Sequence, residues 1–284
     1  MQSNVRHPSV AEVFYPAEAP ELKNMLSDLF RNEPVPEAEK RVKAIIVPHA
    51  AYRYSAEVSA KAFATVAGRS FRTVILMGNA HAYLFDGIAI DPHQAWSSPL
   101  GDVPVDREMS RRLTELAPDL LHELDIAHHC DHVLEVQLPF LQHALEPGFS
   151  ILPMLFGENS PDVYRKIADS LISVMTADDL IVASTDLSHY PAFRDARNID
   201  QKTLEHMANM DIDALEHHEQ EITQRKIAGA TSAFCSPDAV KTLLEIGSRL
   251  GWKSGEPTYM NSGDVVHDDR LAVVGYGSIA FYES

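Results

Sequence analysis

The sequence predicts a three-layer α/β/α fold, in which helices cover a mainly parallel or mixed sheet. Short apolar runs of strand length alternate with longer segments of helical spacing, an order typical of parallel sheets. The 284 residues, 45% of them hydrophobic, suffice for one large core. No long linker divides them, and the charged, proline-bearing segment 32–39 reads as a loop between an N-terminal helix and the first core strand. We therefore expect a single domain spanning residues 1–284.

The elements follow from local pattern. An apolar run at 45–47 predicts the first core strand, and the helical segment 56–66 with the strand 73–77 completes a βαβ unit. Further strands are predicted at 87–90, 150–155, 180–184 and 271–281. Further helices are predicted at 106–116, 132–144, 161–175, 200–208 and 237–250.

Composition excludes several classes of protein. The formal net charge of -17 is spread along the chain, which argues against unaided binding to nucleic acid or an anionic membrane. Two cysteines, Cys130 and Cys235, are too few for a disulfide scaffold. The first residues lack an apolar signal region, and no stretch approaches the ~18 apolar residues of a membrane span. We expect a cytoplasmic protein.

Three strand-like runs are each followed by a histidine, at His49, His81 and His189. In open α/β sheets, ligands bind beyond the carboxyl ends of the strands, so side chains placed there converge. We expect His49 and His81 to lie side by side on adjacent parallel strands of one βαβ unit. Imidazole binds metals and titrates near neutrality, so these residues predict a metal or acid/base site.

Asp186 precedes His189 by three residues. Its carboxylate is a candidate to orient an imidazole or to ligate a cation, and the alternative is an ordinary turn residue after a strand. Ser184 and Ser188 are plausible turn formers, since no Gly-x-Ser-x-Gly segment marks either as a nucleophile.

A polar pair, His132 and Glu135, opens the predicted helix 132–144. Residues three apart share a helix face, so both could look into a catalytic pocket. The alternative is a surface helix with a histidine-rich entry.

Cys235 stands in a loop that enters a helix at Pro237. A thiol near a helix N-terminus can have a depressed pKa and serve as thiolate ligand or nucleophile, whereas most lone cysteines are buried small hydrophobes.

Ordered motifs over most of the chain resemble the Memo family, which includes the proteins called AmmeMemoRadiSam system protein B. The matching segments, in family order, are Arg6-His7-Pro8 with Ala11-Glu12-Val13-Phe14-Tyr15-Pro16, Val47-Pro48-His49, Gly78-Asn79-Ala80-His81, Trp96-Ser97-Ser98-Pro99-Leu100-Gly101, Asp131-His132 with Glu135-Val136-Gln137-Leu138-Pro139, Ser184-Thr185-Asp186-Leu187-Ser188-His189 and Tyr259-Met260-Asn261-Ser262-Gly263-Asp264.

The family is similar in fold to LigB-type extradiol dioxygenases, which hold non-haem iron with two histidines and a carboxylate. The resemblance implies that His49 and His81 are metal ligands and that His189 is the acid/base histidine. The family's cysteine stands four residues before a proline, where this chain has Ala233, and Cys235 is only two residues before Pro237. Either a local shift brings Cys235 to the metal or fewer protein ligands hold it.

Two further departures from the family pattern fall beside the histidines. The usual glycine after the first histidine's alanine is Ala51, and the Pro-Ser before the second histidine is Asn79-Ala80. The shape of the pocket is therefore expected to differ locally.

Three functions follow from these observations. The first is a metal-dependent redox enzyme, resembling a dioxygenase, that holds Fe(II) or copper with open coordination positions, with zinc a further option if a thiolate joins the site. The second is a non-catalytic metal-binding partner of a radical-SAM-associated protein, as the family name suggests. The third is a metal-assisted hydrolase with His189 as acid/base.

Overall fold

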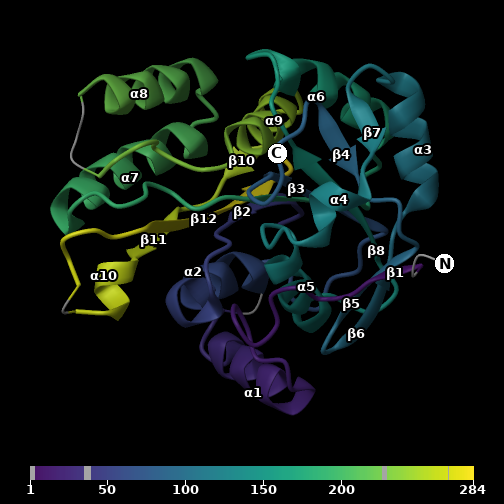
Figure 1. Cartoon of the computed structure of the whole chain (residues 1–284), viewed down its shortest axis with the longest axis horizontal. Coiled ribbons are helices and arrows are strands. Elements are labelled where there is room, and N and C mark those ends of the chain that lie inside the picture. Colours follow the sequence, from purple (N-terminus) through teal and green to yellow (C-terminus); the bar gives the residue numbers. More distant parts are fainter. Residues whose placement is uncertain (1–3, 35–39, 226–228, 268) are drawn as a thin grey trace.

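A nine-stranded sheet forms the centre of the computed structural model, which describes residues 4–34, 40–225, 229–267 and 269–284 (Figure 1). The expected loop 32–39 lies outside the described residues from 35 onward. Four central strands are parallel, in the order β2 (Val42–Val47), β9 (Leu180–Ser184), β3 (Thr73–Asn79) and β8 (Ser150–Phe156).

Antiparallel strands flank this parallel centre and make the sheet mixed. On one side β12 (Gly275–Tyr282) runs against β2, with β10 (Lys253–Ser254) and β11 (Thr258–Asn261) paired to it. On the other side β4 (Ile88–Ile90) runs against β8 and pairs in parallel with β7 (Leu121–Glu123).

The predicted adjacency of the first two core strands is wrong. Strand β9 lies between β2 and β3 and pairs with both, with Ile181 opposite Ala44 on one side and Ile75 on the other. Hydrophobic pattern identifies strands but not their order, so a strand from much later in the chain could not be placed between them. His49 and His81 therefore follow strands that are separated by one strand.

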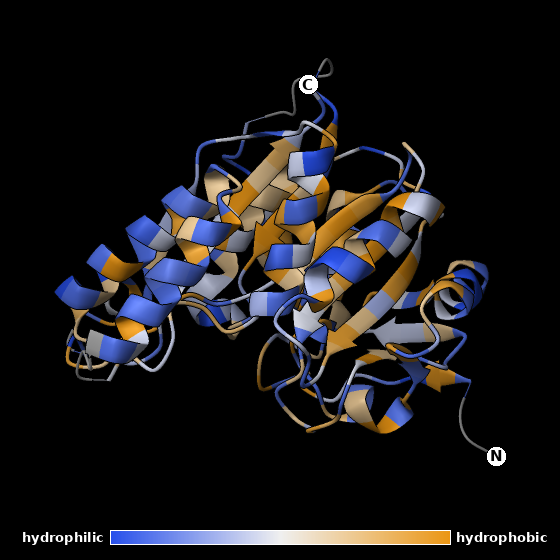
Figure 2. Ribbon diagram, turned by 90° about the horizontal axis from the view of Figure 1, so that it is seen from above, coloured by the Kyte–Doolittle hydropathy of each residue, from blue (hydrophilic) through white to orange (hydrophobic). Residues whose placement is uncertain are grey.

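Alternation along the buried strands creates the two faces that helices cover. Ile45 and Val74 pack on one face, beneath α1 (Ala19–Phe30), α2 (Tyr52–Ala64) and α5 (Leu138–Ala144). Ile46 and Ile75 pack on the other, beneath α3 (Arg107–Leu116), α6 (Val163–Val174), α7 (Phe193–Ala208), α8 (Ile212–Arg225) and α9 (Pro237–Arg249). Figure 2 shows hydrophobic residues concentrated in the strands and hydrophilic ones along the outer helices. The predicted three-layer α/β/α fold is confirmed.

A small sheet and two short α-helices lie outside the central sheet and its covering helices. The sheet contains β1 (Val5–Arg6), β5 (Ala95–Ser98) and β6 (Gly101–Pro104), and the helices are α4 (Asp125–His129) and α10 (Ser262–Val265). Within the described ranges, no helix has the length and apolar character needed to cross a membrane.

The predicted helix 132–144 is wrong in its first half. A 3-10 turn, η1 (Glu135–Gln137), precedes α5, which begins at Leu138 with Pro139 in its first turn. Proline suits that position because the first N–H groups of a helix have no intrahelical partner. His132 therefore lies in a loop before the turn, so that its direction is independent of the helix face.

Candidate metal centre

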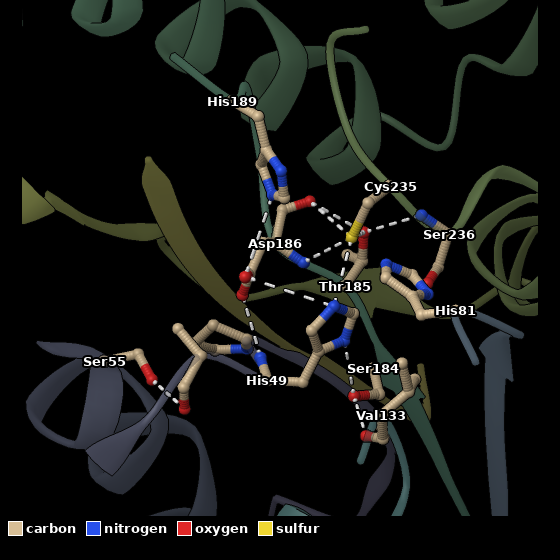
Figure 3. Close-up of polar contacts among 12 residues, drawn as sticks. His49, Ser55, His81, Val133, Ser184, Thr185, Asp186, His189, Cys235 and Ser236 are labelled. Carbon is tan, nitrogen blue, oxygen red and sulfur yellow. Dashed lines mark hydrogen bonds and ion pairs between the residues drawn. The ribbon is translucent and has the colours of Figure 1, made fainter. Parts of the chain in front are cut away.

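Three of the expected site residues stand at the same position relative to their strands. His49, His81 and Asp186 each lie two residues beyond the end of β2, β3 and β9, respectively. Because these strands are parallel, their carboxyl ends meet at one edge of the sheet. The loop before α9 brings Cys235 to the same edge (Figure 3).

His49, His81 and Cys235 form a group with the geometry of a metal site. One donor atom from each lies within 4.8 Å of the others. The Sγ of Cys235 is 3.2 Å from Nε2 of His49. A sulfur and a nitrogen that share a tetrahedral zinc ion are about 3.6 Å apart, so a small adjustment accommodates an ion. His49 is buried, whereas His81 is exposed.

The hydroxyl of Ser184 fixes the tautomer of His49. It donates its one hydrogen to the carbonyl of Val133, at 2.6 Å, and accepts a hydrogen bond from the amide of Gln137, at 2.9 Å. The contact of 3.2 Å between this hydroxyl and Nδ1 of His49 must therefore have the imidazole as donor. Nε2 keeps its lone pair, and that lone pair faces Cys235.

A backbone carbonyl fixes the tautomer of His81 as the Ser184 hydroxyl fixes that of His49. Nδ1 of His81 lies 2.8 Å from the carbonyl oxygen of Asn79, which can only accept, so Nδ1 carries the hydrogen. The backbone N–H of His81 donates to the carboxylate of Asp131, at 2.7 Å. A metal-ligating histidine usually donates the N–H of its other ring nitrogen to such an acceptor, which leaves Nε2 for the ion.

Burial keeps the thiol of Cys235 protonated in the absence of a cation. Burial, together with the nearby Asp186 carboxylate, raises the pKa of this thiol to about 12. Of the two alternatives for this thiol, the raised pKa agrees with a buried cysteine, because desolvation outweighs the backbone N–H of Asp186 that donates to Sγ at 3.1 Å. A thiolate here needs a compensating positive charge, such as a metal ion bound to both imidazoles provides.

Asp186 lies between two imidazoles without ligating geometry. Its Oδ2 is 4.0 Å from Nε2 of His49 and 3.8 Å from Nε2 of His189, and its Oδ1 accepts the backbone N–H of His49 at 2.9 Å. Burial raises the pKa of Asp186 to about 7, and burial lowers that of His189. A carboxyl with a pKa near neutrality beside an imidazole is suited to proton transfer.

His132 completes the cluster from its loop. Its ring centroid is 5.4 Å from that of His49 and 5.7 Å from that of His81. Burial lowers the pKa of His132, so that its imidazole is predominantly neutral at pH 7. The structure thus brings six of the seven expected site residues to one place: His49, His81, His132, Asp186, His189 and Cys235.

Glu135 faces elsewhere. Its carboxylate pairs with Arg6 at 2.8 Å and accepts hydrogen bonds from the backbone of Ser9 and Val10 and from the hydroxyl of Tyr15. Burial alone would raise the pKa of Glu135, but the Arg6 guanidinium and these N–H groups outweigh it and lower the pKa. The expected shared helix face with His132 is absent, since the helix starts later, and the contacts of Glu135 anchor the N-terminal segment.

Sequence reasoning missed the groups that orient the ligands. Ser184 was expected to be a turn former, and Gln137, Asp131 and Asn79 received no role. Ser184 and Asn79 are the last residues of their strands, Asp131 directly precedes His132, and Gln137 lies five residues after it. Each of the four takes part in a hydrogen bond of this region. Polar residues at the last position of a buried strand, such as Ser184 and Asn79, were the available signal, because a fully apolar strand needs none there.

Known proteins match most of the chain in three comparisons. The model of the family described as "Memo-like protein" matches residues 6–280. A "MEMO1 family protein" of Desulfurococcus amylolyticus is 30% identical, with 98% of this chain and 99% of that protein covered. A "MEMO1 family protein" of Methanosarcina mazei is 31% identical, with 97% and 98% covered. The crystal structure of an uncharacterized protein from Escherichia coli K12 aligns with a TM-score of 0.49 and 13% identity, over 84% of this chain and 99% of that one.

Proposed function

Because this chain belongs to the Memo family, and because two imidazoles and a thiol converge at its sheet edge, we propose that it is a metal-dependent oxidoreductase. The observation that carries the proposal is the grouping of His49, His81 and Cys235, with one donor atom from each within 4.8 Å of the others. Their orientation supports it, because both imidazoles carry the hydrogen on Nδ1 and leave Nε2 free for an ion.

The donor set favours a transition metal. A thiolate selects softer ions and argues against magnesium or calcium, while imidazole suits copper, iron and zinc. We assign copper or Fe(II) to the site. Zinc is not redox-active, so a site that holds zinc would contradict the assignment of an oxidoreductase. When bound, the ion supplies open coordination positions for dioxygen or a reducible substrate.

The remaining residues of the cluster hold and move protons. His189, with 25% of its side chain exposed, lies between solvent and the carboxyl of Asp186, whose Oδ2 is 3.8 Å away. The same carboxyl oxygen lies 4.0 Å from Nε2 of His49. Both distances exceed hydrogen-bond length, and catalytic contacts of this kind often tighten only when substrate binds. The proton route that we propose runs from solvent through His189 and Asp186 to the ligands, and His132 borders the ligands.

The test is reactivity of loaded protein with dioxygen. Protein is loaded anaerobically with one equivalent of Cu(I) or Fe(II), freed of excess ion, and mixed with oxygenated buffer containing ascorbate while oxygen uptake is followed. The proposal predicts sustained uptake that both His49→Ala and His189→Ala abolish, with metal retained in His189→Ala. Uptake equal in the unmodified protein and His49→Ala would assign the reactivity to adventitious ion and overturn the proposal.

A second function, metal carriage without catalysis, is favoured by the exposure of one ligand. His81 is exposed, while His49 and Asp186 are buried. A partner could displace an exposed imidazole first and receive the ion. The partner class would be the radical-SAM-associated protein that the family resemblance implies. Metal-loaded protein that transfers its ion to such a partner but consumes no dioxygen would favour this function.

A further inference from the structure

Asn79, the last residue of β3, joins the two segments that carry His81 and Cys235. Its backbone carbonyl accepts the hydrogen of Nδ1 of His81, at 2.8 Å. Its backbone N–H donates in the other direction, to the hydroxyl of Ser236 at 3.1 Å. Ser236 directly follows Cys235 and is completely buried. One residue thus contacts both the second imidazole ligand and the neighbour of the thiol.

The side chain of Asn79 also caps helix α9 from outside that helix. The first helical residue is Pro237, and the side chain of the N-cap residue Ser236 makes no capping hydrogen bond. Oδ1 of Asn79 instead accepts the backbone N–H groups of Asp238, at 3.2 Å, and of Ala239, at 3.3 Å. These are the two N–H groups that an N-cap side chain normally satisfies. The start of α9 is therefore fixed to the end of β3.

We propose that Asn79 is a positioning residue that holds the sulfur of Cys235 at the distance from His49 and His81 at which all three can share one ion. The inference rests on the proposed metal function. Asn79 connects the loop before Pro237 to β3 through its side-chain cap and through its backbone N–H, which donates to Ser236. Without the cap, the loop keeps its hydrogen bonds to the β9 segment, from Cys235 to Asp186 and from Ser236 to Thr185, and its connection to β3 is reduced to that one backbone bond. The position of the thiol relative to His81 is then less firmly fixed.

Asn79→Ala separates the capping of α9 from the orientation of His81. The change removes the side chain that caps α9 and keeps the backbone carbonyl that orients His81. The probe is Co(II), whose bond to a thiolate gives a sulfur-to-metal charge-transfer band in the near ultraviolet. Cys235→Ser defines the spectrum without sulfur. Asn159→Ala is the matched control, since its amide also reaches Asp238, at 3.5 Å, but contacts neither capped N–H group.

We expect the unmodified protein and Asn159→Ala to show the band. We expect Asn79→Ala to bind Co(II) at least about tenfold more weakly, with a band reduced toward that of Cys235→Ser, as loss of groups that orient ligands usually produces. An undiminished band and unchanged affinity in Asn79→Ala would overturn the positioning role while leaving the metal proposal intact. No cobalt binding by the unmodified protein would overturn both.

Ser236→Ala keeps the test decisive if Asn79→Ala does not fold. This change removes the acceptor of the Asn79 backbone N–H and retains the cap. A weaker band than in the unmodified protein supports the inference, and an identical band and affinity contradict it. Thermal unfolding of each metal-free variant shows whether it has folded.

Discussion

The hydroxyl oxygen of Ser184 lies 3.2 Å from Nδ1 of His49 and, because its own hydrogen goes to Val133, it can only accept from the imidazole. This contact determines which ring nitrogen of His49 is free for an ion. Ser184→Ala should therefore weaken metal binding by about 10- to 100-fold. Competition titration with a chromophoric chelator measures the affinity.

The matched control for Ser184 is Ser59→Ala, which removes a buried serine hydroxyl from α2 without touching the cluster. We expect this variant to bind metal like the unmodified protein. Equal affinity in Ser184→Ala and Ser59→Ala would show that the tautomer of His49 does not depend on Ser184.

Glu135→Gln should destabilise the fold and leave metal binding unchanged. The change removes the charge that pairs with the buried guanidinium of Arg6, and an unpaired buried charge typically costs about 3 kcal/mol in the free energy of unfolding. Urea denaturation measures the loss, and metal titration of the folded variant checks the site. A variant of normal stability that has lost turnover would return Glu135 to the catalytic set.

The sequence alone located most of the elements and most of the cluster, because both depend on local pattern. Apolar runs identified the core strands, and residues just beyond them identified His49, His81, Asp186 and His189. The order of strands depends on pairing between distant segments, so the insertion of β9 between β2 and β3 was not predictable from periodicity.

The position of Cys235 also depends on contacts between distant segments, which local sequence pattern does not predict. Spacing from Pro237 left open whether the thiol or Ala233 would reach the site. The structure places Sγ beside His49, with the loop held by hydrogen bonds to Asp186. Those partners are about fifty residues away in the sequence, so no local rule could select between the two arrangements.

Asp200 should make the stability of the metal-free protein fall as pH rises. This carboxyl is fully buried and accepts the backbone N–H of Ser188 and the hydroxyl of Tyr259, and burial raises its pKa from 3.8 to about 7. The folded state therefore holds a proton that the unfolded state releases. The stability contributed by this proton is fully present below pH about 4 and is lost as pH rises through about 7, by roughly 4 kcal/mol.

Asp200→Asn should remove that part of the pH dependence, since an amide does not titrate. Urea denaturation below pH about 4 and above about 8 measures the free energy of unfolding in the two regimes. Asp195→Asn, an exposed change on the same helix, serves as control. Parallel pH profiles for Asp200→Asn and the unmodified protein would contradict the assignment.

His189→Ala should retain metal, because the imidazole of His189 lies nearest to Asp186 and outside the group of three donors. Elemental analysis of the purified variant measures this. We expect a metal content like that of the unmodified protein, together with loss of oxygen uptake. Metal lost to the extent seen in His49→Ala would make His189 a ligand instead of an acid/base residue.

X-ray absorption at the metal edge of anaerobically loaded protein tests the central claim most directly. The account predicts two imidazole nitrogens and one sulfur, the sulfur at about 2.3 Å, with the sulfur signal absent from Cys235→Ser and with metal content reduced in His49→Ala and His81→Ala. A spectrum with only oxygen and nitrogen neighbours, and metal content unchanged in both histidine variants, would contradict it.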